Sequence, residues 1–121
     1  MKKRGIGVGV SFYGTGYGNG FPDVSKATVC LHENGKVGIY VGATEVGQGA
    51  KTALLQIGAE TLNLLLEDIL FISEDTSLMP DSGTAAASRQ TYNTGNAIRI
   101  ACENFKCKLI KIAQKELGLN G

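Results

Sequence analysis

The sequence predicts an α+β fold in which two helices pack on one face of a small sheet that contains a β-hairpin. Three observations carry this prediction. Short β-rich runs occur early in the chain, two later segments have apolar residues at helical spacing, and no internal repeat or linker divides the 121 residues. We therefore expect residues 1–121 to form one unit, which is a single domain or a fragment of one.

The first expected element is a strand at the start of the chain. Residues 5–13 place apolar side chains at period two with glycines between them, at Ile6, Val8, Val10 and Phe12. The glycine-rich residues 14–20 that follow are predicted to form a loop, because such a sequence has little propensity for regular structure.

A hairpin is expected next, followed by the first helix. Residues 27–33 and 36–42 are β-rich, and Asn34-Gly35 between them suits a two-residue type I′ turn. From Gln48 to about Leu66 the apolar residues fall close to helical spacing, so a helix should begin at the Gly-Gln-Gly turn.

The second half of the chain is predicted to form a strand and a long helix. Residues 69–72 are an apolar strand, and residues 80–84 carry the signals of a loop. The final helix should run from about Thr94 to Leu117, with apolar residues on one face, lysines opposite and Gly118 as its terminator.

Composition excludes several classes of function. Twelve Lys and Arg residues against eleven Asp and Glu residues leave a net charge of +1, which favours neither a nucleic acid nor an anionic membrane as partner. The three cysteines, Cys30, Cys102 and Cys107, lie in apolar segments and are expected to be reduced. With neither a signal peptide nor a membrane-spanning run, the expectation is a soluble, cytoplasmic protein.

Two loops lead into the predicted helices and could hold a ligand. Residues 42–49 and residues 83–95 both end at a helix N-terminus, where unpaired N–H groups favour an anion such as phosphate. Gln48 in the first loop could hydrogen-bond a polar ring or an oxo group. The alternatives left open are a plain glycine turn for the first loop and a polar cap network for the second.

Taken together, Gly42-Ala43-Thr44-Glu45-Val46-Gly47-Gln48-Gly49 and the stretch from Asp81 to Ala97 resemble the molybdopterin-binding large subunit of the xanthine dehydrogenase and aldehyde oxidase family. The similarity extends to the Arg4-Gly5-Ile6-Gly7 opening, the Asn34-Gly35 hairpin and the final helix. The chain would then be a single fragment, residues 1–121, of a molybdopterin-binding domain.

The resemblance implies a set of cofactor-binding residues. They are Gly47, Gln48, Gly49, Ala86, Ala87, Ser88, Arg89, Gln90 and Thr91. They would contact a molybdenum-molybdopterin cofactor, with the cytosine dinucleotide form left open. The backbone of Ala87 would lie beside the molybdenum, and Phe12 and Tyr13 would lie at the wall of the substrate pocket.

The resemblance also implies an activity and partners. Family members hydroxylate purines, other N-heterocycles or aldehydes with oxygen from water. Their catalytic base lies in a Gly-Glu pair, which this chain lacks, so no catalytic residue is assigned and the chain is expected to be inactive alone. Partners would be the remainder of the subunit, 2Fe-2S and FAD subunits or domains, and a small-molecule substrate.

Two other hypotheses for the function of this chain are consistent with the sequence. The chain could be a freestanding nucleotide- or anion-binding module, or an assembly domain whose apolar surfaces drive self-association. Glu45 is interpreted as a complement to a helix dipole, and His32, far in sequence from any other probable ligand, gives no metal site. Arg89 could pair with a cofactor phosphate or with a neighbouring carboxylate.

Overall fold

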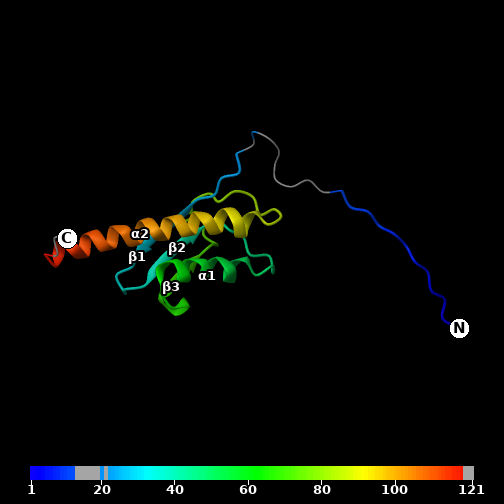
Figure 1. The fold of residues 1–121 in the computed structure, drawn as a ribbon, viewed down its shortest axis with the longest axis horizontal. Coiled ribbons are helices and arrows are strands. Elements are labelled where there is room, and N and C mark those ends of the chain that lie inside the picture. Colours follow the sequence, from blue (N-terminus) through cyan, green and yellow to red (C-terminus); the bar gives the residue numbers. More distant parts are fainter. Residues whose placement is uncertain (13–19, 21, 119–121) are drawn as a thin grey trace.

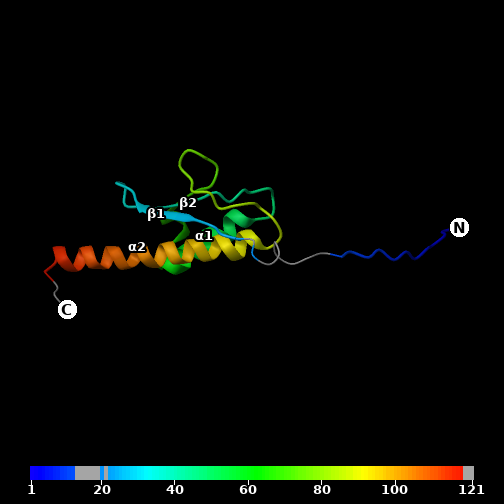
Figure 2. The ribbon, with the colours of Figure 1, turned by 90° about the horizontal axis from the view of Figure 1, so that it is seen from above.

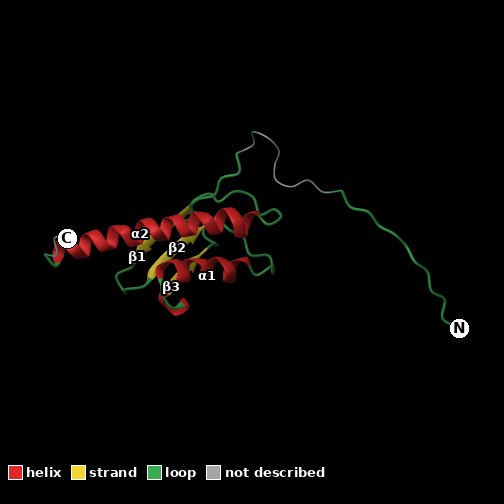
Figure 3. Cartoon of the chain, viewed as in Figure 1, coloured by secondary structure: helices red, strands yellow, loops and turns green. Residues whose placement is uncertain are grey.

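The computed structural model describes residues 1–12, 20 and 22–118 of the chain. Its elements are β1 (Ala27–Leu31), β2 (Val37–Val41), α1 (Ala50–Leu62), a 3₁₀ turn (Leu66–Asp68), β3 (Ile69–Ile72), a π-helical turn (Gln90–Thr94) and α2 (Gly95–Glu116). Figure 1 shows the long α2 beside the shorter α1, and Figure 3 marks the loops that connect the elements.

The three strands form one mixed sheet in the order β1-β2-β3. β1 pairs antiparallel with β2, with Leu31 opposite Val37, and β3 pairs parallel with β2, with Ile69 opposite Val37. α1 therefore makes the crossover that a parallel pair requires. Figure 2 shows both helices on the same side of the sheet, which confirms the predicted α+β architecture.

The core lies between the sheet and the two helices. Alternate residues of β2, Val37, Ile39 and Val41, are buried, as expected for one face of a strand that packs against helices. Ile39 and Val41 join a cluster with Leu54 of α1 and with Ile98 and Cys102 of α2.

Two helical glycines allow this close packing. A β-carbon at Gly58 of α1 would lie 2.4 Å from Cδ1 of Ile39, and one at Gly95 would lie 2.8 Å from Cδ1 of Ile57. Atoms do not approach this closely without rearrangement, so Gly58 permits the short distance between α1 and the sheet, and Gly95 permits the short distance between the start of α2 and the second half of α1. These distances position the loops that precede both helices.

The predicted strand at residues 5–13 is wrong for its described part. Residues 5–12 form no strand, and the side chains of Ile6, Val8 and Val10 are at least 90% exposed. A period-two pattern gives a strand only where a neighbouring strand supplies hydrogen bonds, and no described residue pairs with this segment. The predicted loop at residues 14–20 lies outside the described residues, except for Gly20.

The hairpin is confirmed, but its predicted turn is not. Instead of a two-residue Asn34-Gly35 turn, five residues (32–36) lie between Leu31 and Val37, the last pair of the ladder, and residues 33–35 form a three-residue loop. His32 and Lys36 close the loop through an N–H···O bond of 2.9 Å, and among the loop's residues only Gly35 has a positive φ, of 81°. This is a type I turn followed by a left-handed residue, the common three-residue hairpin loop.

The remaining boundaries agree closely with the predictions. β3 covers residues 69–72 as expected, and α2 begins one residue after the predicted start. α1 ends at Leu62, before the predicted Leu66, because Asn63 adopts a left-handed conformation and its N–H bonds the last turn. Among the described residues, no helix is long and apolar enough to cross a membrane.

Candidate functional site

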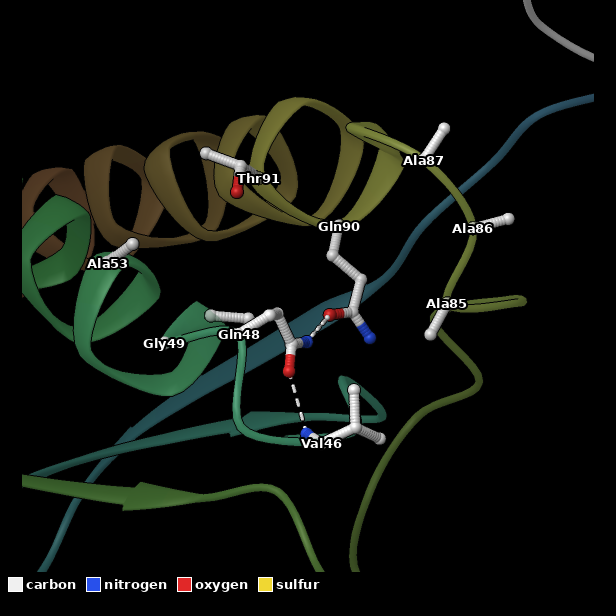
Figure 4. A pocket seen from close by; sticks show the side chains of 10 residues that line it. Val46, Gln48, Gly49, Ala53, Ala85, Ala86, Ala87, Gln90 and Thr91 are labelled. Carbon is white, nitrogen blue, oxygen red and sulfur yellow. Dashed lines mark hydrogen bonds between the residues drawn. The ribbon is translucent and has the colours of Figure 1, made fainter. Parts of the chain in front are cut away.

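The loops that precede α1 and α2 meet around one pocket. A cavity of about 240 Å³ lies between them, at the point where both helices begin. It is lined by Val46, Gln48, Gly49, Ala50, Ala53, Ala85, Ala86, Ala87, Gln90 and Thr91. The two sequence motifs, about 40 residues apart, thus contribute to the same site, as Figure 4 shows.

Two glutamines join the loops across this pocket. Nε2 of Gln48 donates to Oε1 of Gln90 at 2.9 Å and to the carbonyl of Thr44 at 3.0 Å. Nε2 of Gln90 also donates to the Thr44 carbonyl, at 3.2 Å. Oε1 of Gln48 accepts the N–H of Val46 at 2.7 Å, so both carboxamides have a fixed orientation.

The Gly47-Gln48-Gly49 turn is held by the carboxylate of Glu45. Oε1 accepts the N–H groups of Gly47 at 2.7 Å and of Gly49 at 3.0 Å, and Oε2 accepts the N–H of Lys51 at 2.9 Å. Both glycines have positive φ, 95° and 80°, which few other residues adopt. These hydrogen bonds, the one from Lys51 foremost, lower the pKa of Glu45 below its usual value.

The expectation that the start of α1 is a ready anion site is therefore wrong. The N–H groups of Gly49 and Lys51 at this helix start already bond Glu45, and the carboxylate also complements the helix dipole. Glu45 has the structural role that the sequence suggested.

The loop before α2 has an unusual backbone at the pocket. Ala87 has a φ of 47°, a left-handed conformation that costs a residue with a β-carbon on the order of 1 kcal/mol. The Gln90–Thr94 segment then begins the helix as a π-helical turn, a form that is frequent at functional sites. The backbone of residues 85–87 thereby faces the turn that carries Gln48.

Arg89 anchors this loop from its other side. Its guanidinium pairs with Asp23 and also donates to the carbonyls of Val24, Ser82 and Thr84, and its side chain is only 7% exposed. Of the two partners considered from the sequence, the structure therefore shows the carboxylate. Arg89 does not line this pocket, and its observed hydrogen bonds hold the loop, so its contact with a cofactor stays a prediction.

Buried hydroxyls fix both loops to the sheet. Oγ of Ser82, which is fully buried, accepts the N–H of Gly42 at 2.9 Å and donates to the carbonyl of Lys26 at 2.8 Å. The hydroxyls of Ser25 and Thr94 bond each other at 2.8 Å. The segment before β1 thus ties together the end of β2 and the start of α2.

Most of the predicted cofactor residues are brought together, and some are not. Gln48, Gly49, Ala86, Ala87, Gln90 and Thr91 line the pocket. Gly47 lies in the supporting turn, and Ser88 lines an adjacent shallow groove of about 390 Å³ with Thr91, Tyr92 and Arg99. Phe12, predicted at the substrate wall, is fully exposed and does not line the pocket, and Tyr13 lies outside the described residues.

Four lining residues were not predicted from the sequence. Ala50 and Ala53 lie on the first turn of α1, and Val46 and Ala85 lie within the two motifs, close to the predicted residues. The signal for the alanines was present, because small residues three apart beside a glycine turn leave room for a neighbour at a helix start.

The lining is suited to a neutral polar ring. None of the lining residues is charged, whereas carboxamide, hydroxyl and backbone groups alternate with small apolar side chains. Among the described residues no group of three or more His, Cys, Asp or Glu side chains could hold a metal.

Comparisons with known proteins identify the family to which this chain belongs. The family model described as molybdopterin cofactor-binding domain matches residues 1–121. The aldehyde oxidoreductase of Megalodesulfovibrio gigas is 35% identical over 119 residues, which cover 96% of this chain and 12% of that protein. The xanthine dehydrogenase molybdenum-binding subunit of Escherichia coli O157:H7 is 36% identical over 112 residues, covering 89% of this chain and 14% of the subunit.

Solved structures with a similar fold include two enzymes, an aldehyde oxidoreductase and a CO dehydrogenase. The aldehyde oxidoreductase from Desulfovibrio desulfuricans superposes with a TM-score of 0.65 at 41% identity, covering 69% of this chain and 10% of that one. The CO dehydrogenase from Oligotropha carboxidovorans has a TM-score of 0.73 at 29% identity, covering 84% and 13%.

The fold and the pocket thus define a cofactor-binding domain. The chain is a member of the molybdopterin cofactor-binding domain family. It spans about an eighth of the length of the curated relatives described above, at 12% and 14%.

Proposed function

We propose that this chain forms one wall of the molybdopterin pocket of a molybdenum hydroxylase. The observation that carries the proposal is the contact between Gln48 and Gln90, which joins the two motifs around one pocket. In this proposal Gly47, Gln48, Gly49, Ala86, Ala87, Ser88, Gln90 and Thr91 form the cofactor-binding surface. Arg89 acts through the loop geometry that it holds.

The residues present fit such a cofactor. A pterin ring is planar and carries donors and acceptors at its edge, which carboxamides can match because each has both kinds of group. After their mutual contact, Gln48 and Gln90 still have acceptor capacity on Oε1, and Nε2 of Gln90 keeps a second hydrogen. The small residues at 85–87 leave room for a bulky ring against the backbone. When bound, the molybdenum centre supplies two-electron oxidation of the substrate.

The finer assignments are part of the same proposal. The cofactor would be bound as molybdopterin or as its cytosine dinucleotide form, and the substrate would be a purine, another N-heterocycle or an aldehyde. Electrons would leave through 2Fe-2S and FAD groups on other domains or subunits. The proposal places the catalytic base outside this chain, since the pocket residues include no acidic or basic side chain. A cytoplasmic location is proposed with it.

The test is cofactor retention. The chain, co-expressed with the rest of a molybdenum-binding subunit, would be purified as wild type, Gln48→Ala and Gln90→Ala, and molybdenum and released pterin would be measured. We expect both variants to hold several-fold less of each than the wild type. A matched control is Gln114→Ala, at an exposed position of α2. Equal occupancy in all four proteins would refute the assigned roles.

The alternative of a freestanding nucleotide or anion binder has less support. It relied on both helix N-termini, and the start of α1 is taken by Glu45. Calorimetry with mono- and dinucleotides on the 121-residue chain decides between the two proposals, because only the alternative requires binding without a pterin.

A further inference from the structure

The carboxylate of Glu45 occupies the position where an anionic ligand of α1 would bind. It accepts hydrogen bonds from the N–H groups of Gly47, Gly49 and Lys51 at 2.7 to 3.0 Å. A full negative charge at this point outweighs the roughly half positive charge of a helix N-terminus. A phosphate would meet repulsion there and would find these donors already engaged.

The same hydrogen bonds determine where Gln48 points. Gln48 lies between two glycines whose N–H groups both bond Oε1 of Glu45, so its backbone is held from both sides. From this position its carboxamide reaches Gln90 across the pocket at 2.9 Å. Without Glu45, two glycines with positive φ would leave the turn free to adopt other conformations.

We infer that Glu45 is the positioning residue of this pocket: its carboxylate shapes the turn that presents Gln48 to the cofactor, and it closes the start of α1 to anions. The part of this inference that concerns the cofactor rests on the proposed function. The part that concerns the turn and the start of α1 rests on the observed hydrogen bonds. Glu45 acts through Gln48 and touches no reacting atom in this role.

The charged side chains near Glu45 are paired with other groups and do not hold the Gly47-Gln48-Gly49 turn. Nζ of Lys51 is 2.9 Å from Oε1 of Glu74, so this ammonium is paired with a different carboxylate. On the facing loop, the guanidinium of Arg89 is paired with Asp23. No ion pair to Glu45 occurs within the described part of the chain, and its partners there are backbone donors.

The first experiment titrates inorganic phosphate into the ¹⁵N-labelled chain. In the wild type, the amide signals of Gly47, Gly49 and Lys51 should stay in place, whereas in Glu45→Ala they should shift with saturation. A matched control is Glu60→Gln, an exposed carboxylate on the same helix, which should behave as wild type. The same response in wild type and Glu45→Ala, whether a shift or none, would overturn the inference.

The Glu45→Gln variant keeps the experiment decisive if Glu45→Ala does not fold. Glutamine can still accept from Gly47 and Gly49, but its amide would place a donor against the Lys51 N–H. Protection of these amides from hydrogen exchange should fall at acidic pH in the wild type and should be independent of pH in Glu45→Gln. Identical pH profiles would contradict the role of the carboxylate.

Cofactor retention separates this inference from the proposed function. In the co-expressed subunit we expect pterin content to fall severalfold from wild type to Glu45→Gln and further to Glu45→Ala. Absence of pterin from the wild type would refute the proposed function and leave the phosphate result standing. Full retention in Glu45→Ala would refute the positioning role and leave the proposed function intact.

Discussion

The carboxamide nitrogen of Gln48 lies 2.9 Å from the carboxamide oxygen of Gln90, although 42 residues separate them in the sequence. The two side chains come from the starts of different helices, so their contact requires the sheet, α1 and α2 to be packed correctly. The bond therefore reports both on the fold and on the pocket.

A double-mutant cycle should detect this bond. Gln48→Ala and Gln90→Ala each remove one partner, and we expect a coupling energy of about 0.5 to 1.5 kcal/mol in urea unfolding, since that is the usual net value of such a bond. Pairing Gln48→Ala with Gln114→Ala, at an exposed position of α2, serves as the control and should be additive. Additivity in the first cycle would show that the bond does not persist in solution.

Arg89→Lys should destabilise the protein by about 1 to 3 kcal/mol. A lysine ammonium cannot reach Asp23 and the carbonyls of Val24, Ser82 and Thr84 together, and buried acceptors would lose their donors. Denaturant unfolding measures the loss. Arg99→Lys, in the exposed pair with Glu103, should change stability by less than about 0.5 kcal/mol. Equal effects at the two positions would contradict the buried anchor.

Gly58→Ala should destabilise the chain, although alanine is the better helix former. The new β-carbon would lie 2.4 Å from Cδ1 of the buried Ile39, and overpacking of this kind costs about 1 to 3 kcal/mol. Adding Ile39→Val removes that methyl group and should recover part of the loss. Gln56→Ala, on the exposed face of α1, is the control for helix propensity. A stabilised Gly58→Ala variant would refute the close packing.

The stabilising contribution of Glu45 should depend on pH. Because its pKa is lowered in the folded state, its contribution is complete above the usual 4.5 and is lost as pH falls through the lower folded value. The difference in urea midpoint between wild type and Glu45→Gln should therefore be constant at neutral pH and shrink in acid. A difference that does not change with pH would show that the charge is not involved.

The three cysteines should react in a fixed order. Cys107 is exposed and should be alkylated first, followed by the half-buried Cys30. Cys102 is fully buried, and burial raises its pKa to about 11, so it should react only when the protein unfolds. Mass spectrometry of the timed reaction with iodoacetamide gives the order. Rapid labelling of Cys102 in the native chain would mean that α2 does not pack on the sheet as described.

Local patterns were sufficient for most of the fold. β3 and the start of α2 were predicted within one residue, because an apolar run and a helical stripe report on burial directly. The strand expected at residues 5–13 failed because pairing depends on a partner, which the segment's own sequence does not reveal. The end of α1 depended on the left-handed Asn63, a conformation that glycine would have signalled more clearly.

The site was predictable in its location but not in its internal bonds. The two motifs identified the pocket, and the position of Glu45 near a helix start indicated its structural role. The partner of Arg89 could not be predicted, because Asp23 lies 66 residues earlier and only the fold brings them together. The π-helical start of α2 likewise has no local signature, since it depends on how residues 85–94 pack against the opposite loop.

Gly95 does not line the pocket between the two loops, but it determines how closely the start of α2 packs against α1. A β-carbon at Gly95 would lie 2.8 Å from Cδ1 of Ile57 in the second half of α1, so the backbone at the start of α2 packs directly against that methyl group. A methyl group added at Gly95 would act as a spacer that separates the helices, and even 1 Å of separation would take the two carboxamides beyond hydrogen-bonding range. Ligand affinity would then depend on a residue that does not line the pocket between the two loops.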